Sequence, residues 1–246
     1  MKEHLYGLIG YPLTHSFSKR YFSEKFEKEG LLHCRYELFP METIELLPEL
    51  LKNHPTLRGL NVTIPYKQAV LPFLDEFGEG IAALGAVNVI DIAEDGKLTG
   101  HNTDIAGFEY SLKNLLGAED PGGALVLGTG GASKAVQFVL SKMKIPFHLV
   151  SRDPEIGFHY DQLTPEIVAE HRLIVNTTPL GMSPHTETCP KIPFEPISQR
   201  HLLFDLVYNP EETLFLKKGR LQGAQTQNGL EMLYTQAEKA WAIWNK

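Results

Sequence analysis

Near the middle of the chain stands the stretch Ala124-Leu125-Val126-Leu127-Gly128-Thr129-Gly130-Gly131-Ala132-Ser133. An apolar run, a glycine turn and a following helical pattern are typical of the first strand, turn and helix of a dinucleotide-binding fold. Gly128 permits the tight turn, and Gly130 lets the backbone approach a pyrophosphate, whose charge the amides at the helix N-terminus stabilise. The stretch predicts a dinucleotide site, and a glycine turn without a ligand is the alternative.

The pattern around this stretch predicts an α/β fold with two domains. Downstream, apolar runs at 147–150, 173–175 and 202–207 continue a Rossmann-type succession, so we assign residues 104–227 to the nucleotide domain. Upstream, strands are expected at 5–9, 35–39, 59–62 and 86–92, with helices at 17–29 and 44–53. Asp95-Gly96 reads as a tight hairpin, which gives the 1–103 domain a mixed sheet. A last helix over 229–244 carries an apolar stripe.

Composition narrows the function classes. The chain has 246 residues and a formal charge of −7, without a dense Lys/Arg run, which argues against a nucleic-acid partner. No apolar stretch approaches the roughly 20 residues that a membrane helix requires. The two cysteines, Cys34 and Cys189, stand far apart. Their spacing predicts no metal site and no disulfide framework, so a cytoplasmic location is expected.

Cofactor choice is predicted at the end of the strand over 147–150. There the chain reads Ser151-Arg152-Asp153. An arginine at this place holds a ribose 2′-phosphate, whereas an acid holds the 2′-hydroxyl. Arg152 favours NADP, and Asp153 keeps NAD open as the alternative.

Polar residues in the first hundred positions predict a substrate site. Hydroxyls in Thr14-His15-Ser16-Phe17-Ser18 follow the first strand and suit a carboxylate ligand, although they could simply cap a helix. Asn61 and Thr63 project to one face of an extended segment, and Lys67 follows. Asn88 is an amide in an apolar strand, and Asp104 is an acid near a helix start that could be an N-cap. A primary amine beside a carboxylate suits alcohol–ketone redox chemistry with a nicotinamide.

Eight ordered motifs identify a family resemblance that covers nearly the whole chain. They are Gly10-Tyr11-Pro12-Leu13-Thr14-His15-Ser16, Asn61 to Lys67, Gly85 to Asn88, Gly100 to Asp104, Gly128 to Ser133, Asn176 to Met182, Asp205 to Pro210 and Asn228 to Leu233. In this order they resemble shikimate dehydrogenase.

The resemblance implies NADP-dependent interconversion of 3-dehydroshikimate and shikimate, on the way to chorismate and the aromatic amino acids. Lys67 and Asp104 match the catalytic pair of the family. The matching substrate-binding residues are Ser16, Ser18, Asn61, Thr63, Lys67, Asn88, Asp104, Tyr208 and Gln236, in a cleft between the domains. The matching cofactor-binding residues are Gly128, Thr129, Gly130, Gly131, Ala132, Ser151, Arg152, Leu206 and Gly229. The last helix of the family returns to the first domain, so residues 228–246 are expected to complete it.

Three departures from the family pattern stand out. Lys19 replaces a usual proline, Leu206 replaces a common methionine, and Asp153 follows Arg152 without a second basic residue nearby. A quinate/shikimate dehydrogenase that uses NAD is therefore an alternative, and a paralogue that binds ligand without catalysis is a more distant one. The oligomeric state is expected to be a monomer or a homodimer.

Overall fold

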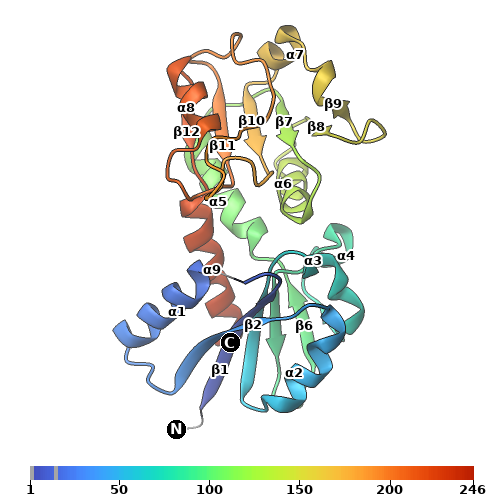
Figure 1. Ribbon diagram of the computed structural model, residues 1–246, viewed down its shortest axis with the longest axis vertical. Coiled ribbons are helices and arrows are strands. Elements are labelled where there is room, and N and C mark those ends of the chain that lie inside the picture. The colour runs from blue at the N-terminus through green and yellow to red at the C-terminus, as the bar shows by residue number, and fades with distance from the viewer. Residues whose placement is uncertain (1–2, 14–15) are drawn as a thin grey trace. The chain divides into compact units, whose positions relative to one another are not determined.

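The chain divides into two compact units. The computed structural model describes residues 3–13 and 16–246. Unit 1 comprises Met1–Thr103 with Ala237–Lys246, and unit 2 comprises Asp104–Gln236. Figure 1 shows a sheet with flanking helices in each unit. The α/β class with a mixed-sheet domain and a Rossmann-type domain is confirmed.

Unit 1 is built on a mixed sheet with the strand order β2-β1-β3-β5-β6-β4. Strand β1 (His4–Gly10) pairs in parallel with β2 (Cys34–Pro40) and β3 (Leu57–Val62). Strand β5 (Val89–Ile92) runs antiparallel to β3 and to β6 (Leu98–His101), while β4 (Glu76–Phe77) is a short edge. The predicted hairpin at Asp95-Gly96 is confirmed, and Gly96 has a φ of +89° there.

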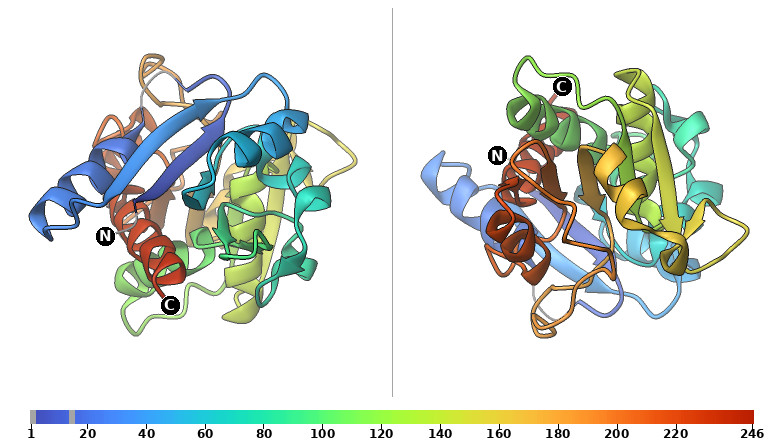
Figure 2. Two further views of the ribbon diagram at one scale, coloured as in Figure 1. Left: turned by 90° about the horizontal axis from the view of Figure 1, so that it is seen from below. Right: turned by 90° about the horizontal axis from the view of Figure 1, so that it is seen from above.

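Helix α1 (Phe17–Lys28) contributes to an apolar core of unit 1. Its Phe22 and Phe26 pack in one cluster with Tyr6 and Tyr36 of the sheet and with Trp244. The remaining helical segments of this unit are η1 (Ile44–Leu46), α2 (Leu47–Asn53), α3 (Tyr66–Ala69), η2 (Leu71–Phe73) and α4 (Ile81–Leu84). Figure 2 shows α1 and α2 on opposite sides of the sheet.

Unit 2 is a parallel sheet of order β12-β11-β10-β7-β8-β9 with a separate core on each face. Its strands are β7 (Ala124–Leu127), β8 (Phe147–Ser151), β9 (Phe158–His159), β10 (Leu173–Asn176), β11 (Leu202–Asp205) and β12 (Gln225–Gln227). Helices α5 (Asp104–Leu116) and α6 (Gly131–Lys142) cover one face. Helices α7 (Pro165–Glu170) and α8 (Leu214–Leu221) cover the other, and η3 (Tyr160–Gln162) precedes α7. The predicted dinucleotide-binding succession is therefore present.

The last helix, α9 (Leu230–Trp244), is shared between the units. Residues 228–246 were expected to complete the first domain, but the division falls between Gln236 and Ala237. The physical reason is that Met232, near the start of α9, belongs to a core of unit 2, whereas Ala240 and Trp244 belong to the core of unit 1. The apolar stripe along the helix thus serves two cores in succession.

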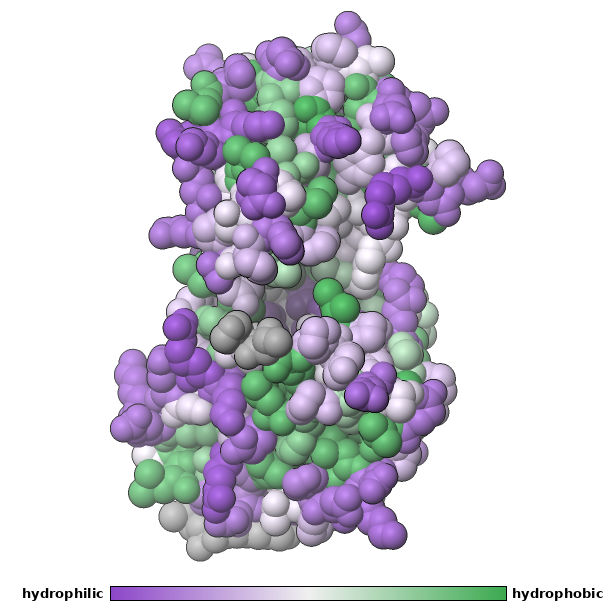
Figure 3. Space-filling view, viewed as in Figure 1, coloured by the Kyte–Doolittle hydropathy of each residue, from purple (hydrophilic) through white to green (hydrophobic). Residues whose placement is uncertain are grey.

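Several predicted element bounds are wrong by a few residues. Asn88 lies just before β5 rather than inside a strand. Strand β3 ends at Val62 as predicted but begins at Leu57, earlier than expected, and Thr63 follows it. The strand predicted over 202–207 ends at Asp205. Lys67 lies in the short helix α3. Within the described part of the chain no helix is long and apolar enough to cross a membrane, and Figure 3 shows hydrophilic residues over both units.

Candidate active site

The two serines expected to hold a carboxylate lie at the start of α1. Ser16 is the N-cap, and its Oγ accepts a hydrogen bond from Lys19 N at 3.3 Å. A hydroxyl that accepts from the backbone keeps its own proton for donation to an anion. Capping and ligand binding are thus compatible at Ser16. Ser18 is the second residue of α1, whereas Thr14 and His15 lie outside the described residues.

Asn61 is buried near the end of β3, where it is held by a residue that the sequence reasoning missed. Tyr36, from the edge strand β2 on the far side of β1, donates its hydroxyl to Asn61 Oδ1 at 2.6 Å. A side-chain hydrogen bond also joins Tyr36 to Ser18, and burial raises the pKa of the Tyr36 phenol. The only signal for Tyr36 in the sequence is its alternation with the charged Arg35 and Glu37 in β2. That signal predicts a core position rather than a link between two site residues.

Asn88 is held by the segment that leads into α5. Its Oδ1 accepts from Thr103 N at 2.7 Å, and its Nδ2 donates to Thr103 Oγ1 at 3.1 Å. Asn88 and Thr103 are each 3% exposed, and buried amides of this kind are costly unless paired. Asp104, the next residue, is the first of α5 and is 7% exposed. Thr103, the last residue before α5, is thereby fixed within unit 1.

Lys67 is half-buried on α3, and its backbone is tied to the same region. The carbonyl of Lys67 accepts from Val87 N at 2.7 Å, directly before Asn88. Thr63, half-buried after β3, receives its position from a bond of its N–H to Ile9 O at 3.0 Å. Unit 1 therefore brings the predicted residues Ser18, Asn61, Asn88 and Lys67 into one bonded framework.

In unit 2 the glycine turn has the geometry that a dinucleotide requires. Gly128 has a φ of +104°, and a Cβ there would lie 2.9 Å from Thr177 Oγ1, so protein sterics alone demand glycine. Gly130 is different: its φ is −73°, and a Cβ would meet nothing within 4 Å. Neither backbone strain nor packing against the described residues requires glycine at position 130. The open space beside it fits the close approach of a pyrophosphate.

The helix after this turn is ready to receive an anion. Ser133, the third small residue of the motif, is buried and donates from Oγ to Gly128 O at 2.8 Å, which braces the turn. Thr129, Gly131 and Ala132 form the start of α6 or the turn before it, and none is an exposed large side chain. The first amides of a helix lack intrahelical partners and favour negative charge.

In the loop after β8, Arg152 and Asp153, which favour different cofactors, have different surroundings. Asp153 is engaged locally, because its Oδ1 accepts from Glu155 N at 3.0 Å and its N–H donates to Ser151 Oγ at 3.0 Å. Arg152 is exposed and forms no hydrogen bond or ion pair with another residue that the structure describes. The loop thus offers a cation to a ligand and occupies its acid in a turn, which fits NADP better than NAD.

The remaining predicted residues lie around the ends of β11 and α9. Gly229 packs closely on Leu206, since a Cβ at 229 would lie 2.1 Å from Leu206 O. Tyr208 is half-buried. Gln236 is 8% exposed, and its side-chain amide nitrogen Nε2 donates a hydrogen bond to Leu233 O at 3.0 Å. Their side chains come from unit 2.

Beneath this region lies a buried network that sequence reasoning did not find. Asp205 accepts hydrogen bonds from Thr213 Oγ1, Asn176 Nδ2 and Val207 N, at 2.5, 2.9 and 3.0 Å. Burial raises the pKa of the Asp205 carboxyl to about 6, against the lowering effect of these three bonds. The network joins the ends of β10 and β11.

Comparisons with known proteins agree with this geometry. Residues 8–90 match the family model described as the shikimate dehydrogenase substrate binding domain. The chain is 36% identical, over 98% of its length and 91% of the relative's, to shikimate dehydrogenase (NADP(+)) of Carboxydothermus hydrogenoformans.

Two solved structures are similar over nearly the whole chain. The shikimate 5-dehydrogenase of Thermus thermophilus in complex with NADP(H) and shikimate is 33% identical, with a TM-score of 0.85 and coverage of 98% and 93%. The quinate dehydrogenase of Corynebacterium glutamicum in complex with NAD is 29% identical, with a TM-score of 0.89 and coverage of 99% and 94%.

Proposed function

Because the chain belongs to the shikimate dehydrogenase family, we propose that it interconverts shikimate and 3-dehydroshikimate with NADP as the cofactor. The observation that supports this most directly is the framework of unit 1, in which the Lys67 carbonyl is bonded to Val87 N and the neighbouring Asn88 is bonded to Thr103. It fixes the backbone of the proposed proton carrier relative to the residue that precedes Asp104.

Lys67 is the proposed acid–base group. In oxidation its neutral amine takes the proton of the reacting hydroxyl, and in the reverse direction its ammonium returns that proton to the ketone oxygen. Asp104 is assigned the orientation of the amine and the hydroxyl. Bound NADP supplies the hydride acceptor, and NADPH the donor, at the carbon that bears this oxygen.

The other predicted residues hold the substrate. Ser16 and Ser18 are assigned to its carboxylate, and Ser16 keeps a proton for donation while it caps α1. Asn61, Thr63, Asn88, Tyr208 and Gln236 are assigned to the ring hydroxyls. Buried amides with fixed partners suit this role, because their orientation is set before the ligand arrives.

The residues proposed to hold NADP are those of the open glycine turn and of the loop after β8. The amides of Gly130 to Ala132 would face the pyrophosphate, Arg152 the 2′-phosphate and Ser151 the adjacent ribose. Leu206 and Gly229 form an apolar and closely packed wall that suits the nicotinamide ring.

The test is an initial-rate assay of shikimate oxidation, followed as nicotinamide absorbance, with NADP and NAD side by side and with quinate as the parallel substrate. Faster turnover of shikimate with NADP is expected. Preference for quinate or NAD would replace this function by the quinate dehydrogenase alternative, and thermal stabilisation by ligands without turnover would replace it by a sensor. A monomeric or homodimeric state and a cytoplasmic location stay predictions.

A further inference from the structure

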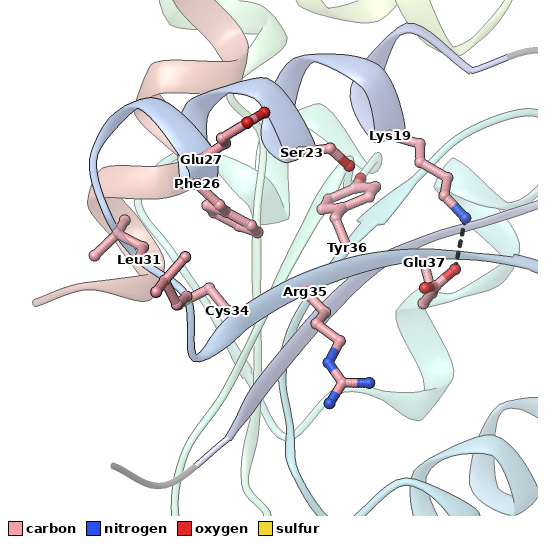
Figure 4. Close-up of a pocket in the computed structure, with 10 residues that line it drawn as sticks. Lys19, Ser23, Phe26, Glu27, Leu31, Cys34, Arg35, Tyr36 and Glu37 are labelled. Atoms are coloured by element: carbon pink, nitrogen blue, oxygen red, sulfur yellow. Dashed lines mark hydrogen bonds and ion pairs between the residues drawn. The ribbon is translucent and has the colours of Figure 1, made fainter.

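Tyr36 is locked in place between the elements that carry two of the proposed substrate residues. It projects from β2 toward α1 in Figure 4, is 3% exposed, and stacks on Phe22 with ring centroids 4.8 Å apart and planes at 13°. A ring held in this way has little freedom to redirect its hydroxyl.

The hydrogen bond of Tyr36 sets the polarity of the Asn61 amide. A phenol carries one proton, and Tyr36 donates it to Asn61 Oδ1 at 2.6 Å. The amide nitrogen must then lie on the other side, where its partner is Asn88 O at the long distance of 3.5 Å. The nitrogen carries two hydrogens, so at least one N–H of Asn61 remains for a ligand.

We propose that Tyr36 is a positioning residue for substrate, which acts by holding Asn61 so that it offers an N–H to a hydroxyl oxygen of shikimate. The inference rests on the proposed function. It makes the proposed function more specific, because the N–H of Asn61 then selects for a hydrogen-bond acceptor on the substrate and not for a donor.

The test compares Tyr36→Phe with Tyr6→Phe in shikimate oxidation. Phenylalanine keeps the ring that stacks on Phe22 and removes the hydroxyl. Without that hydroxyl the Asn61 amide can turn over, so the KM for shikimate should rise about three- to tenfold, the usual effect of one neutral hydrogen bond. The kcat should stay within about twofold, because the proton carrier is untouched. Tyr6, 1% exposed in the same unit, provides the matched loss of a buried hydroxyl and should leave both constants unchanged.

A double-mutant cycle separates positioning from general structural damage. If Tyr36 acts through Asn61, then Asn61→Ala and Tyr36→Phe/Asn61→Ala should have the same KM. Additive losses, or an unchanged KM in Tyr36→Phe, would overturn the positioning role while wild-type turnover stands. Absence of turnover in the wild-type chain would instead overturn the proposed function. A Tyr36→Phe chain that fails to fold would show that the hydroxyl serves stability, and would likewise overturn the role.

A second and independent observation concerns the opposite end of the sheet in unit 1. His4, His33 and Cys34 bring three metal-ligating atoms within 4.8 Å of one another. His4 and Cys34 are register partners on β1 and β2, and His4 N donates to His33 O at 2.9 Å. The Nδ1 atom of His33 is buried without a hydrogen-bond partner among the described residues. A buried nitrogen without a partner is costly, and in the tautomer that leaves the lone pair on Nδ1 a cation would satisfy it.

We propose that these three residues bind Zn²⁺, with a water as the fourth ligand. Two imidazole nitrogens and one thiolate are a donor set that zinc favours. Zinc binding would release the thiol proton of Cys34, because the thiolate is the ligand. Cys34 also lines a pocket of about 300 Å³ between α1 and β2 (Figure 4). The spacing of the cysteines does not reveal this group, because strand pairing brings His4 beside His33 and Cys34.

Titration of the full chain with Co²⁺ tests the site, since tetrahedral Co²⁺ bound by a thiolate absorbs in the visible and near-ultraviolet. A one-to-one spectrum that Zn²⁺ abolishes is expected, and it should be lost in Cys34→Ser and in His33→Gln but kept in Cys189→Ser. Absence of such a spectrum in the wild-type chain, or its persistence in both cluster variants, would overturn the proposal. Shikimate oxidation is a separate readout that does not bear on it.

Discussion

The proposed substrate residues of unit 1 and the proposed cofactor residues of unit 2 are prepared for their ligands in opposite ways. In unit 1, Asn61 and Asn88 are buried and already bonded to Tyr36 and Thr103. In unit 2, Gly130 faces open space and Arg152 is exposed. Rigid polar groups favour precise orientation of a small ring, whereas an open turn receives the backbone of a large, charged ligand. Substitutions in the two regions should therefore fail differently.

The largest effect is expected in unit 1, at the proton carrier. Lys67→Ala should lower kcat for shikimate oxidation roughly 10²- to 10⁴-fold, the usual loss of a general acid–base group, with a smaller change in KM. Lys52→Ala, an exposed lysine of the same unit, is the matched control. Steady-state rates with saturating NADP measure both. A kcat close to that of the wild-type chain would remove Lys67 from the acid–base role.

The network at Asp205 offers a way to test whether unit 2, like unit 1, contains buried polar groups that are held by fixed hydrogen bonds. The pKa of this carboxyl is raised to about 6 in the folded chain, above its ordinary value of 3.8. Between these values the unfolded chain has lost the proton and the folded chain retains it, so the free energy of unfolding should fall as pH rises. Over the pH range between the two pKa values, the free energy of unfolding should fall by roughly 3 kcal/mol in total.

Denaturant unfolding of the wild-type chain and of Asp205→Asn, from pH 4 to pH 7, measures this contribution. The difference between the two free energies should decrease as pH rises to about 6 and then level off. Asp120→Asn, at an exposed acid of the same unit, should show no such trend. A flat difference for Asp205 would mean that its three hydrogen bonds fully offset burial.

Sequence reasoning predicted the features that local sequence patterns encode, and it missed the side-chain contacts that strand pairing creates. The glycine turn and the hairpin at Asp95-Gly96 follow from local patterns. Tyr36 could not be found in this way, because its link to Asn61 depends on β2, β1 and β3 lying side by side in the sheet. The shared packing of α9 was missed for a related reason, since one apolar stripe does not say how many cores it enters.

Gly130→Ala sharpens the contrast at the open turn. The backbone suits alanine and the added methyl meets no described atom, so the free energy of unfolding should stay unchanged. The methyl would instead occupy the approach of the pyrophosphate, and the KM for NADP should rise roughly tenfold to a hundredfold, as expected for about 1–3 kcal/mol of overpacking. Gly123→Ala is the control, because its methyl would make an ordinary contact 3.5 Å from His171. Lost stability in Gly130→Ala would mean that folding, not the ligand, requires this glycine.

The smallest effect is expected in the loop after β8, which is proposed to determine the choice between NADP and NAD. Arg152→Ala should lower kcat/KM with NADP about tenfold, because one charge-assisted contact to the 2′-phosphate is lost, and should leave kcat/KM with NAD unchanged. Asp153→Ala is the natural comparison, since its carboxylate accepts from Glu155 N at 3.0 Å and is occupied in the turn. In Asp153→Ala, the ratio of kcat/KM with NADP to kcat/KM with NAD should change by less than about twofold, because only the weak, screened repulsion between exposed charges is removed. A larger change at Asp153 than at Arg152 would reverse the assignment and show that the acid governs the selectivity of an otherwise open site.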